Sequence, residues 1–346
     1  MSGTSFDGVD AALIKTNGRN FIELIDTSYV EYSPLEKSLY NSSIIKNYKK
    51  ITDIINNKHI SAIKILLTNN SNDIDVIGLH GQTFYHKPNE SWTWQYINSE
   101  LIAKYFNVKV ISDFRIKDIN AGGEGAPLVP IFHKKLILNS KLELPAAILN
   151  IGGISNITVV TVNKELIGFD IGPGNGPLDK LMEKKLKINM DKDGELAKSG
   201  LINKSIKEKT FNLLNKKMNS NSFDRAELDD YCLKYLTNLS TSDGLATLVD
   251  LITDFIEKKI KKYNIKNLII TGGGRKNNTL VSAIKNKIEH KLFIAENLYW
   301  DGDSIEAQAF AYLAIRSLKG MPYTYKSTTG VKESISGGVL YNTFSN

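Results

Sequence analysis

Three glycine-rich turns constrain the fold of this 346-residue chain more than any other feature of its sequence. Each lies beside a short apolar segment, and together they occupy both halves of the chain: Gly3–Gly8, Gly152–Asn156 and Gly272–Gly274. Glycine lets backbone N–H groups approach phosphate oxygens closely, and neighbouring serine and threonine hydroxyls add donors. One such turn is usually structural, whereas three in one chain favour a nucleotide held in a cleft between two domains.

Short apolar strands alternate with amphipathic helices along the chain, which predicts an α/β fold. We expect strands at Val9–Thr16, Phe21–Tyr32, Asp75–Leu79, Val108–Ser112, Ala146–Ile151, Ile157–Val162, Leu166–Asp170 and Leu268–Thr271. We expect helices over residues 34–67, with interruptions, and at Ser99–Phe106, Pro177–Leu186, Ala246–Tyr263 and Asp303–Leu318. The first of these helices should begin with a capping box formed by Ser33 and Glu36.

The charged segment Lys134–Leu144 contains Asn139-Ser140 and marks the expected domain boundary. The prediction is an N-terminal lobe over residues 1–139 and a C-terminal lobe over residues 140–346, whose last segment is free to pack back on the first lobe. The turn at residues 2–5 precedes a strand, as the turn at residues 151–156 does. This internal repeat of a turn and a strand suggests a duplicated α/β domain.

Composition excludes several classes of protein. Cys232 is the single cysteine, so the chain holds no internal disulfide or multi-cysteine zinc site, which fits a reducing compartment. We expect a cytoplasmic protein, because no long apolar run or signal peptide is visible. The net charge of +7 comes from lysines dispersed over segments such as Glu183–Lys187, typical of solvated helix faces. An anionic small substrate would fit that charge, and no nucleic-acid partner is expected.

The segment Gly168–Asn175 carries the strongest candidate for chemistry. The chain has neither the phosphate-binding P-loop motif nor a Rossmann fingerprint after its first strand. Asp170 ends a predicted strand beside Gly172 and Gly174, where it could accept a proton from a nucleophile during phosphoryl transfer. The alternative, equally open from the residues alone, is that Asp170 caps the following helix or a turn.

Arginine suits bidentate binding of a substrate carboxylate, so Arg115, with Asp113 and Asp118 nearby, is a candidate substrate contact. A structural salt bridge is the alternative. His80 and His86 lack the spacing of metal ligands. Glu306 lies three residues after Asp303, which indicates a capping box first and a substrate contact second.

Read together, these segments resemble the anhydro-N-acetylmuramic acid kinases, over nearly the whole chain and in the family's order. Each motif is weak by itself, and the set is specific. The matching stretches are Met1–Asp10, Leu79–Thr83, Asp113–Arg115, Ala121–Pro130, Asn150–Asn156, Gly168–Asn175, Thr271–Gly274, Glu306–Ala311 and Thr329–Gly330.

The resemblance implies a two-domain, actin-like (ribonuclease H-like) ATPase fold with an ATP cleft between the lobes. It implies Asp170 as the catalytic base. The implied ATP-binding residues are Gly3, Thr4, Ser5, Phe6, Asp7, Gly8, Val9, Asp10, Gly152, Gly153, Ser155, Gly272, Gly273 and Gly274. The implied substrate-binding residues are Arg115, Asp118, Glu306, His80, Gln82, Gly174 and Asn175.

The implied reaction converts 1,6-anhydro-N-acetylmuramic acid, ATP and water into N-acetylmuramic acid 6-phosphate and ADP, a step of peptidoglycan recycling. Mg²⁺ is expected mainly on the ATP phosphates, with Asp7 as the one protein group considered for it. No other metal site is expected, and a homodimer is left open. The alternatives are a conventional hexose or N-acetylhexosamine kinase and an inactive nucleotide-binding protein.

The chain departs from the family pattern at two places. Family members carry a few residues of strand before the Met-Ser-Gly-Thr-Ser motif, whereas here Met1 begins it. The family usually has Pro-Lys-Ser before a later arginine-containing motif, whereas this chain has Ser220-Asn221-Ser222 there.

Overall fold

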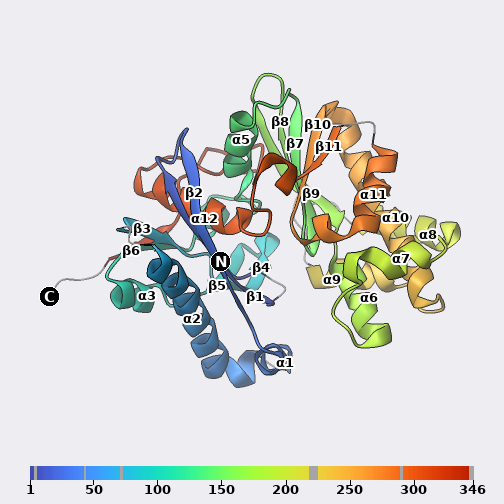
Figure 1. Ribbon diagram of the computed structural model, residues 1–346, viewed down its shortest axis with the longest axis horizontal. Helices are drawn as coiled ribbons and strands as arrows, with labels where there is room; N and C mark the ends of the chain where they lie inside the picture. The colour runs from blue at the N-terminus through green and yellow to red at the C-terminus, as the bar shows by residue number, and fades with distance from the viewer. Residues whose placement is uncertain (4–5, 43, 71–72, 218–224, 289–290, 343–346) are drawn as a thin grey trace. The chain divides into compact units, whose positions relative to one another are not determined.

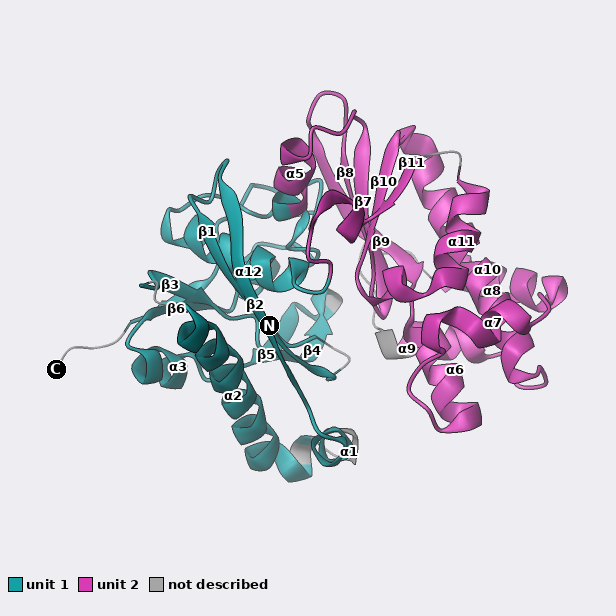
Figure 2. Ribbon diagram, viewed as in Figure 1, with its two compact units in different colours: residues 1–132, 303–346 teal, residues 133–302 magenta. Residues whose placement is uncertain are grey.

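The computed structural model describes residues 1–3, 6–42, 44–70, 73–217, 225–288 and 291–342. The chain forms an α/β protein (Figure 1) and divides into two compact units (Figure 2). Unit 1 comprises Met1–Phe132 and Asp303–Asn346, and unit 2 comprises His133–Gly302. This division falls inside helix α5 (Pro130–Asn139), and residues 303–346 belong to unit 1.

Unit 2 contains a five-stranded sheet in the order β11-β10-β7-β8-β9. Strand β8 runs antiparallel to β7 and β9, whereas β10 runs parallel to both β7 and β11. In chain order this is the 3-2-1-4-5 arrangement of a ribonuclease H-like unit, with β7 in the centre. The strands are β7 (Ala146–Ile151), β8 (Ile154–Val160), β9 (Leu166–Pro173), β10 (Asn267–Thr271) and β11 (Lys291–Ile294).

Helices pack on this sheet to form the core of unit 2. The central strand β7 is buried along its whole length because its neighbours pair with both of its edges. Helix α10 contributes many apolar side chains, including Leu248, Ile252 and Phe255, to the same core. The helices of unit 2 are α6 (Gly176–Leu186), α7 (Glu195–Ser199), α8 (Lys204–Lys217), α9 (Arg225–Leu233), α10 (Thr241–Ile260) and α11 (Asn278–Lys287).

The strands described in unit 1 form three smaller sheets. Strands β1 (Gly8–Thr16) and β2 (Ile22–Glu31) make an antiparallel pair. Strand β6 (Lys109–Ser112) lies between β3 (Val76–Gly78), to which it is parallel, and β12 (Val339–Tyr341), to which it is antiparallel. A hairpin of β4 (Gln82–Lys87) and β5 (Trp92–Tyr96) completes the set.

The helices of unit 1 begin as local sequence dictates. Ser33 and Glu36 form the predicted capping box, since the Glu36 carboxylate accepts from the Ser33 N–H (2.6 Å) and the Ser33 hydroxyl accepts from the Glu36 N–H (3.3 Å). The helices are α1 (Pro34–Ser42), α2 (Ile44–Asn69), α3 (Ser99–Phe106), α4 (Ile116–Asn120) and α12 (Ile305–Leu318). Short 3₁₀ turns lie at Pro88–Glu90, Lys192–Gly194, Lys261–Tyr263, Gly273–Lys276 and Ala295–Leu298.

The expected strands and helices all occur, with shifted ends. Strand β8 starts at Ile154 because the turn before it is tighter than expected. Helix α12 starts at Ile305 with Ser304 as its N-cap, so the expected capping box of Asp303 and Glu306 is not how this helix begins. The β4–β5 hairpin, β11 and β12 were not anticipated.

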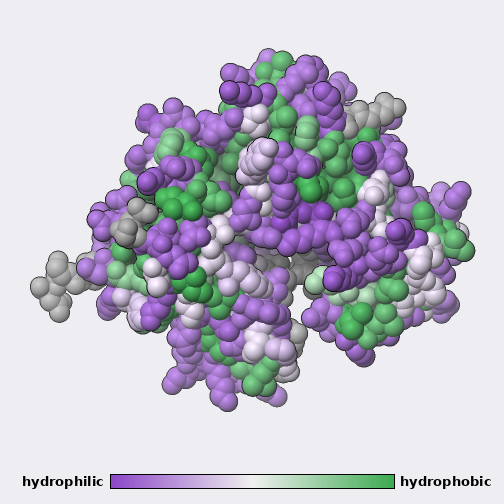
Figure 3. Space-filling view, viewed as in Figure 1, coloured by the Kyte–Doolittle hydropathy of each residue, from purple (hydrophilic) through white to green (hydrophobic). Residues whose placement is uncertain are grey.

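Figure 3 shows one face of the protein, which is mostly hydrophilic. On the face drawn in Figure 3, hydrophobic residues lie in small groups among hydrophilic ones, as is usual for a folded chain. Within the described residues, no helix combines the length and the apolar character needed to cross a bilayer.

Candidate active site

The first glycine turn, in unit 1, is held by aromatic stacking. Thr4 and Ser5 lie outside the described residues. Phe6 has a positive φ of 51° and is 2% exposed. Its ring stacks between those of Tyr32 and Tyr40, with centroids 3.9 and 4.0 Å away. Phe6 therefore fixes the turn from the interior and does not face outward.

Carboxylates follow this turn. The Asp7 side chain accepts from the Gly8 N–H (2.9 Å), and the Asp7 carbonyl accepts from the Tyr32 N–H (2.9 Å). Burial raises the pKa of Asp10, with Asp7 and Glu306 among the nearby carboxylates that add to the rise. Among the described residues, no group of three or more His, Cys, Asp or Glu side chains is placed to hold a metal ion.

Gln82 and His80 are interior residues. Gln82 has no exposed surface; its Oε1 accepts from the Ser2 hydroxyl (2.6 Å) and its Nε2 donates to the Tyr40 hydroxyl (3.3 Å). His80 is 5% exposed and its ring lies 4.6 Å from that of Phe310. Both were expected to contact substrate directly. That expectation stays a prediction; the Ser2 partner of Gln82 lies at the start of the first glycine turn.

His80 orients Arg115. The Arg115 Nε donates to His80 Nε2 (3.0 Å), and Arg115 Nη1 donates to the carbonyl of Gly125 (2.7 Å). Burial, helped by the adjacent guanidinium, holds the pKa of His80 well below its ordinary value. The imidazole is therefore neutral and can accept this hydrogen bond, which fixes the direction of the guanidinium.

Asp118 organises the loop that follows α4. It is 1% exposed, and its carboxylate accepts from the Gly125 N–H (2.7 Å) and from the Thr329 hydroxyl (2.7 Å). These bonds join the Ala121–Gly125 loop to the C-terminal segment. The expected sugar contact at Asp118 stays a prediction, because in this structure both carboxylate oxygens accept hydrogen bonds within the protein.

The glycine turns of unit 2 meet at one edge of its sheet. The N–H groups of Gly174 and Gly176 donate to the Gly153 carbonyl (both 3.1 Å), and the Asn175 N–H donates to the Gly152 carbonyl (2.7 Å). Ser155 is fully buried and its hydroxyl donates to the Pro173 carbonyl (3.1 Å), so it braces the turn.

Two of these glycines cannot carry a side chain. A Cβ at Gly174 would overlap the Gly152 carbonyl oxygen. Gly272 has a φ of 74°, and a Cβ there would overlap the Asn150 side chain. By contrast, a Cβ at Gly273 would meet Asn175 Nδ2 at an ordinary 3.5 Å, which places Asn175 beside the third glycine turn. Sequence segments around 152, 174 and 273 thus converge within unit 2.

Asp170 lies on β9, the strand that leads into this edge. It is half-buried and pairs with Asn156 of β8, next to a register shift between Ser155 and Asn156. Helix α6 begins at Gly176 with Asn175 at its N-cap position, so Asp170 is not the cap of that helix. This excludes the possibility, left open by the sequence, that Asp170 caps the helix that follows it.

Two residues of this edge were missed in the sequence. The Asn150 side chain, 7% exposed, accepts from the Thr271 hydroxyl (3.4 Å). Arg275, 6% exposed, donates to Glu296 (2.7 Å) and to the Gly272 carbonyl (3.0 Å). The available sequence signal was that Asn150 lies two residues before one glycine turn and that Arg275 directly follows another.

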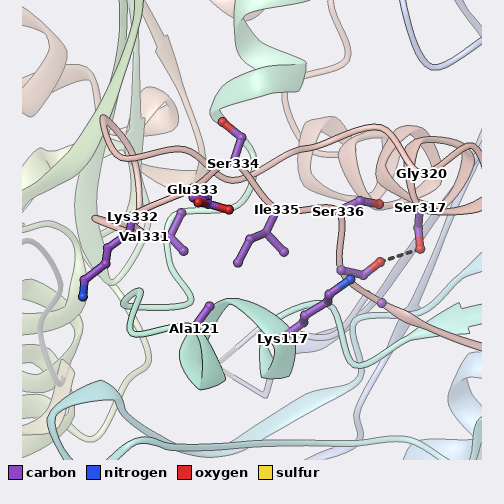
Figure 4. A pocket seen from close by; sticks show the side chains of 12 residues that line it. Lys117, Ala121, Ser317, Gly320, Val331, Lys332, Glu333, Ser334, Ile335 and Ser336 are labelled. Atoms are coloured by element: carbon purple, nitrogen blue, oxygen red, sulfur yellow. Dashed lines mark hydrogen bonds between the residues drawn. The ribbon is translucent and has the colours of Figure 1, made fainter.

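A separate hollow of about 750 Å³ lies in unit 1 (Figure 4). It is bounded by Lys117 and Ala121 near α4 and by the segment Val331–Gly338, with Ser317 donating to the Gly337 carbonyl (2.5 Å). Its lining contains none of the predicted ATP or substrate residues.

The sequence is similar to one family of known proteins along nearly its whole length. A model of the anhydro-N-acetylmuramic acid kinase family matches residues 1–343. The chain is 35% identical to an anhydro-N-acetylmuramic acid kinase of Methylorubrum populi, over 98% of this chain and 97% of that protein. It is 36% identical to one of Pelagibacter ubique, over 99% and 97%.

Among solved structures, the activator of 2-hydroxyisocaproyl-CoA dehydratase from Clostridium difficile is 13% identical, with a TM-score of 0.47 over 92% of this chain and 93% of that chain. A ROK family glucokinase from Streptomyces griseus is 10% identical, with a TM-score of 0.44 over 90% and 97%. The full-length family match and the sequence relatives carry the assignment: the chain belongs to the anhydro-N-acetylmuramic acid kinase family.

Proposed function

We propose that this protein phosphorylates 1,6-anhydro-N-acetylmuramic acid with ATP and opens the anhydro ring with water, giving N-acetylmuramic acid 6-phosphate and ADP. The observation that carries the proposal is the position of Asp170 on the strand that ends in the convergent glycine turns of unit 2. A carboxylate beside backbone that can approach phosphate is what base-assisted phosphoryl transfer requires.

In this mechanism Asp170 accepts a proton from a water molecule as that water attacks the anomeric carbon. The bond between this carbon and the bridging oxygen breaks, and its electron pair passes to the oxygen. That oxygen forms the new bond to the γ-phosphorus, and ADP leaves. The attack is on the face opposite the leaving oxygen, as in inverting glycoside cleavage, with phosphoryl transfer replacing the general acid.

Backbone groups would bind the nucleotide. An added Cβ would meet Ile151 too closely at Gly272 and Gly274, whereas Gly152 and Gly273 have room for one. Glycines in such turns let backbone N–H groups approach phosphate oxygens closely. In this proposal Ser155 holds the turn through its hydrogen bond to the Pro173 carbonyl.

Arg115 would bind the carboxylate of the sugar's lactyl group. Its Nε and Nη1 are held by His80 and Gly125, which directs the guanidinium before substrate arrives. His80, Gln82 and Asp118 are in this proposal positioning residues. Glu306 and Asn175 remain candidates for direct sugar contacts.

In this proposal Mg²⁺ binds mainly the phosphates of ATP and makes few contacts with the protein. The described residues offer no cluster of three metal-ligating side chains, and Mg²⁺ readily keeps its waters while binding phosphates. When bound, it would neutralise phosphate charge, and Asp7 is the protein group considered as a partner for one of its waters. We place the reaction in the cytoplasm, where ATP is available and the single cysteine stays reduced.

The mass of the product tests the proposal. Incubation with ATP and the anhydro sugar should give a product heavier by one phosphoryl group and one water. A product heavier by the phosphoryl group alone would contradict ring opening and favour a conventional sugar kinase. Equal phosphorylation of N-acetylmuramic acid, which lacks the bridge, would favour the same alternative.

Asp170→Asn tests the base. Because ring opening and phosphoryl transfer share one proton acceptor, both should fall together by about 10²–10⁴-fold. Asp53→Asn, a neutralisation of an exposed residue in α2, is the matched control and should leave turnover unchanged. Survival of either step in Asp170→Asn would exclude this role.

A further inference from the structure

The β4–β5 hairpin of unit 1 has a polar face and an aromatic face. His86 pairs with Thr93 across the hairpin, so their side chains lie on the same face. Thr93 and Gln95, two positions apart on β5, are buried, whereas Trp92 and Trp94 are exposed. The hairpin therefore turns its polar side chains toward the interior, where each of them needs a hydrogen-bond partner.

The ring of His86 is neutral at pH 7. Burial and, after it, the charge of Arg115 lower the pKa of this histidine to about 3. A neutral imidazole has one N–H group, and the hydrogen bond made by one ring nitrogen determines which of the two carries the hydrogen.

Thr93 determines that position for His86. Gln95 Nε2 donates to the Thr93 hydroxyl oxygen (2.7 Å), which leaves the hydroxyl hydrogen for another acceptor. The candidates are His86 Nδ1, at 2.9 Å, and the Tyr85 carbonyl, at 3.4 Å. The shorter distance favours His86 Nδ1 as the acceptor. The ring hydrogen of His86 is therefore on Nε2.

This Nε2–H group differs from the nitrogens of the neighbouring His80. Both ring nitrogens of His80 have partners, the Gly81 carbonyl (3.1 Å) and Arg115 Nε (3.0 Å). Nε2 of His86 is buried and has no hydrogen-bond partner within the described residues. A buried donor without a partner is costly, which indicates that another molecule satisfies it when the protein works.

Arg115 lies in the same region of unit 1. It is the N-cap of α4, the helix that contacts β5. Its Nε donates to His80, and its charge lowers the pKa of both His80 and His86. A guanidinium and a fixed imidazole donor are therefore brought together by three separate segments of the chain.

We propose that His86 is a substrate-binding residue whose Nε2–H donates to the same carboxylate that Arg115 binds. The inference rests on the proposed function, since this carboxylate is that of the sugar's lactyl group. A carboxylate oxygen accepts more than one hydrogen bond, so it can bind the guanidinium and the imidazole together. Because Nε2 is buried, reaching it requires a small displacement of neighbouring side chains. The neutral donor then selects sugars that carry the lactyl group over sugars that lack it.

The first test is ¹⁵N NMR of the histidine rings at pH 7, with the His86 signals assigned by their loss in His86→Phe. The free protein should have the ring hydrogen of His86 on Nε2. Saturation with the anhydro sugar, without ATP, should shift the Nε2 signal. A hydrogen on Nδ1, or an Nε2 signal that the sugar leaves unchanged, would overturn the inference.

The second test compares two sugars by calorimetry without ATP: the anhydro sugar and its analogue without the lactyl group. In His86→Phe, which keeps a ring and removes the donor, the Kd for the first sugar should rise by about 10–100-fold. The Kd for the analogue should change by less than about twofold. Equal weakening of both sugars would mean that His86 has only a structural role.

Two further variants keep the test valid if His86→Phe folds poorly. His86→Gln retains an N–H donor near the position of Nε2 and should keep most of the preference for the lactyl sugar; complete loss of the preference would contradict a role for this donor. Tyr85→Phe changes the adjacent residue, whose side chain lies on the other face of the hairpin, and should leave both affinities unchanged.

The outcomes separate this inference from the proposed function. If the wild-type protein opens and phosphorylates the anhydro sugar and His86→Phe keeps its full preference, only the role of His86 is wrong. If the wild-type product lacks the added water, the proposed reaction is wrong, and the comparison of the two sugars still tests His86. If the wild-type protein binds neither sugar, both fail.

Discussion

The first glycine turn of unit 1 and the glycine edge of unit 2 are built by opposite means. In unit 1, side chains hold the turn: Phe6 stacks between two tyrosines, and Gln82 bonds to Ser2 from behind. In unit 2, main-chain hydrogen bonds hold the turn, since the N–H groups of residues 174–176 donate to the carbonyls of Gly152 and Gly153. The same type of turn can therefore be fixed by side-chain packing or by main-chain hydrogen bonds. Substitutions in the two turns should destabilise the protein for different reasons.

Replacement of Phe6 should have the largest effect on stability. Phe6→Ala removes a ring that is 2% exposed and stacked on both faces, so we expect a loss of about 3–5 kcal/mol in the free energy of unfolding. Urea titration measures it. Phe6→Tyr keeps the stack and serves as the control. A loss below about 1 kcal/mol in Phe6→Ala would show that packing does not hold this turn.

Gly174→Ala should act through the main chain. The added methyl group collides with the Gly152 carbonyl, which a side-chain movement cannot relieve, so we expect about 1–3 kcal/mol of destabilisation and about 100-fold slower turnover. Gly273→Ala, where the nearest atom is 3.5 Å away, is the matched control for stability. Equal melting temperatures for both variants would show that the contact between Gly174 and Gly152 does not stabilise this turn.

Acid should destabilise unit 1 more than unit 2, in a graded way. Burial lowers the pKa of His59 and His86 to about 3 and that of His80 well below its usual range, all in unit 1; His133, at about 3, is in unit 2. Below the unfolded pKa of about 6.5, unfolded chains bind protons that the folded protein excludes. Stability is therefore complete above that pH and falls below it, by about 1.4 kcal/mol per pH unit for each histidine.

Hydrogen exchange at pH 7 and pH 5, corrected for intrinsic rates, measures this difference. With three such histidines against one among the described residues, unit 1 should lose protection first. Earlier opening of unit 2 at pH 5 would show that these histidines do not control acid stability.

Local patterns in the sequence predicted the regular elements well. The capping residues Ser33 and Glu36 and the apolar run at Ala146–Ile151 act within a few residues, so their structural outcome is readable locally. Strand β12 was missed because three residues, Val339–Tyr341, become a strand only by pairing with β6, more than two hundred residues earlier. A local sequence pattern does not indicate which distant strand such a short segment pairs with.

The site residues stay predictions, and the structure adds where each of them lies. Glycine requirements are local, and Gly174 and Gly272 lie where the pattern indicated. The family resemblance implies substrate contacts at Gln82 and Asp118, and it could not show that both side chains are buried beside partners distant in the chain, Ser2 and Thr329. Burial of a polar group depends on such partners, which spacing does not reveal.

The bond between Asp118 and Thr329 also bears on the order in which the protein is made. Unit 1 takes residues from both ends of the chain, and the loop after α4 is held by a hydroxyl from its last part. On the ribosome, unit 2 is synthesised before Thr329 exists. The Ala121–Gly125 loop of unit 1 therefore cannot be joined to the C-terminal segment until residue 329 has been made. A chain that ended between Gly274 and Thr329 would lack this bond although it held every predicted ATP-binding residue.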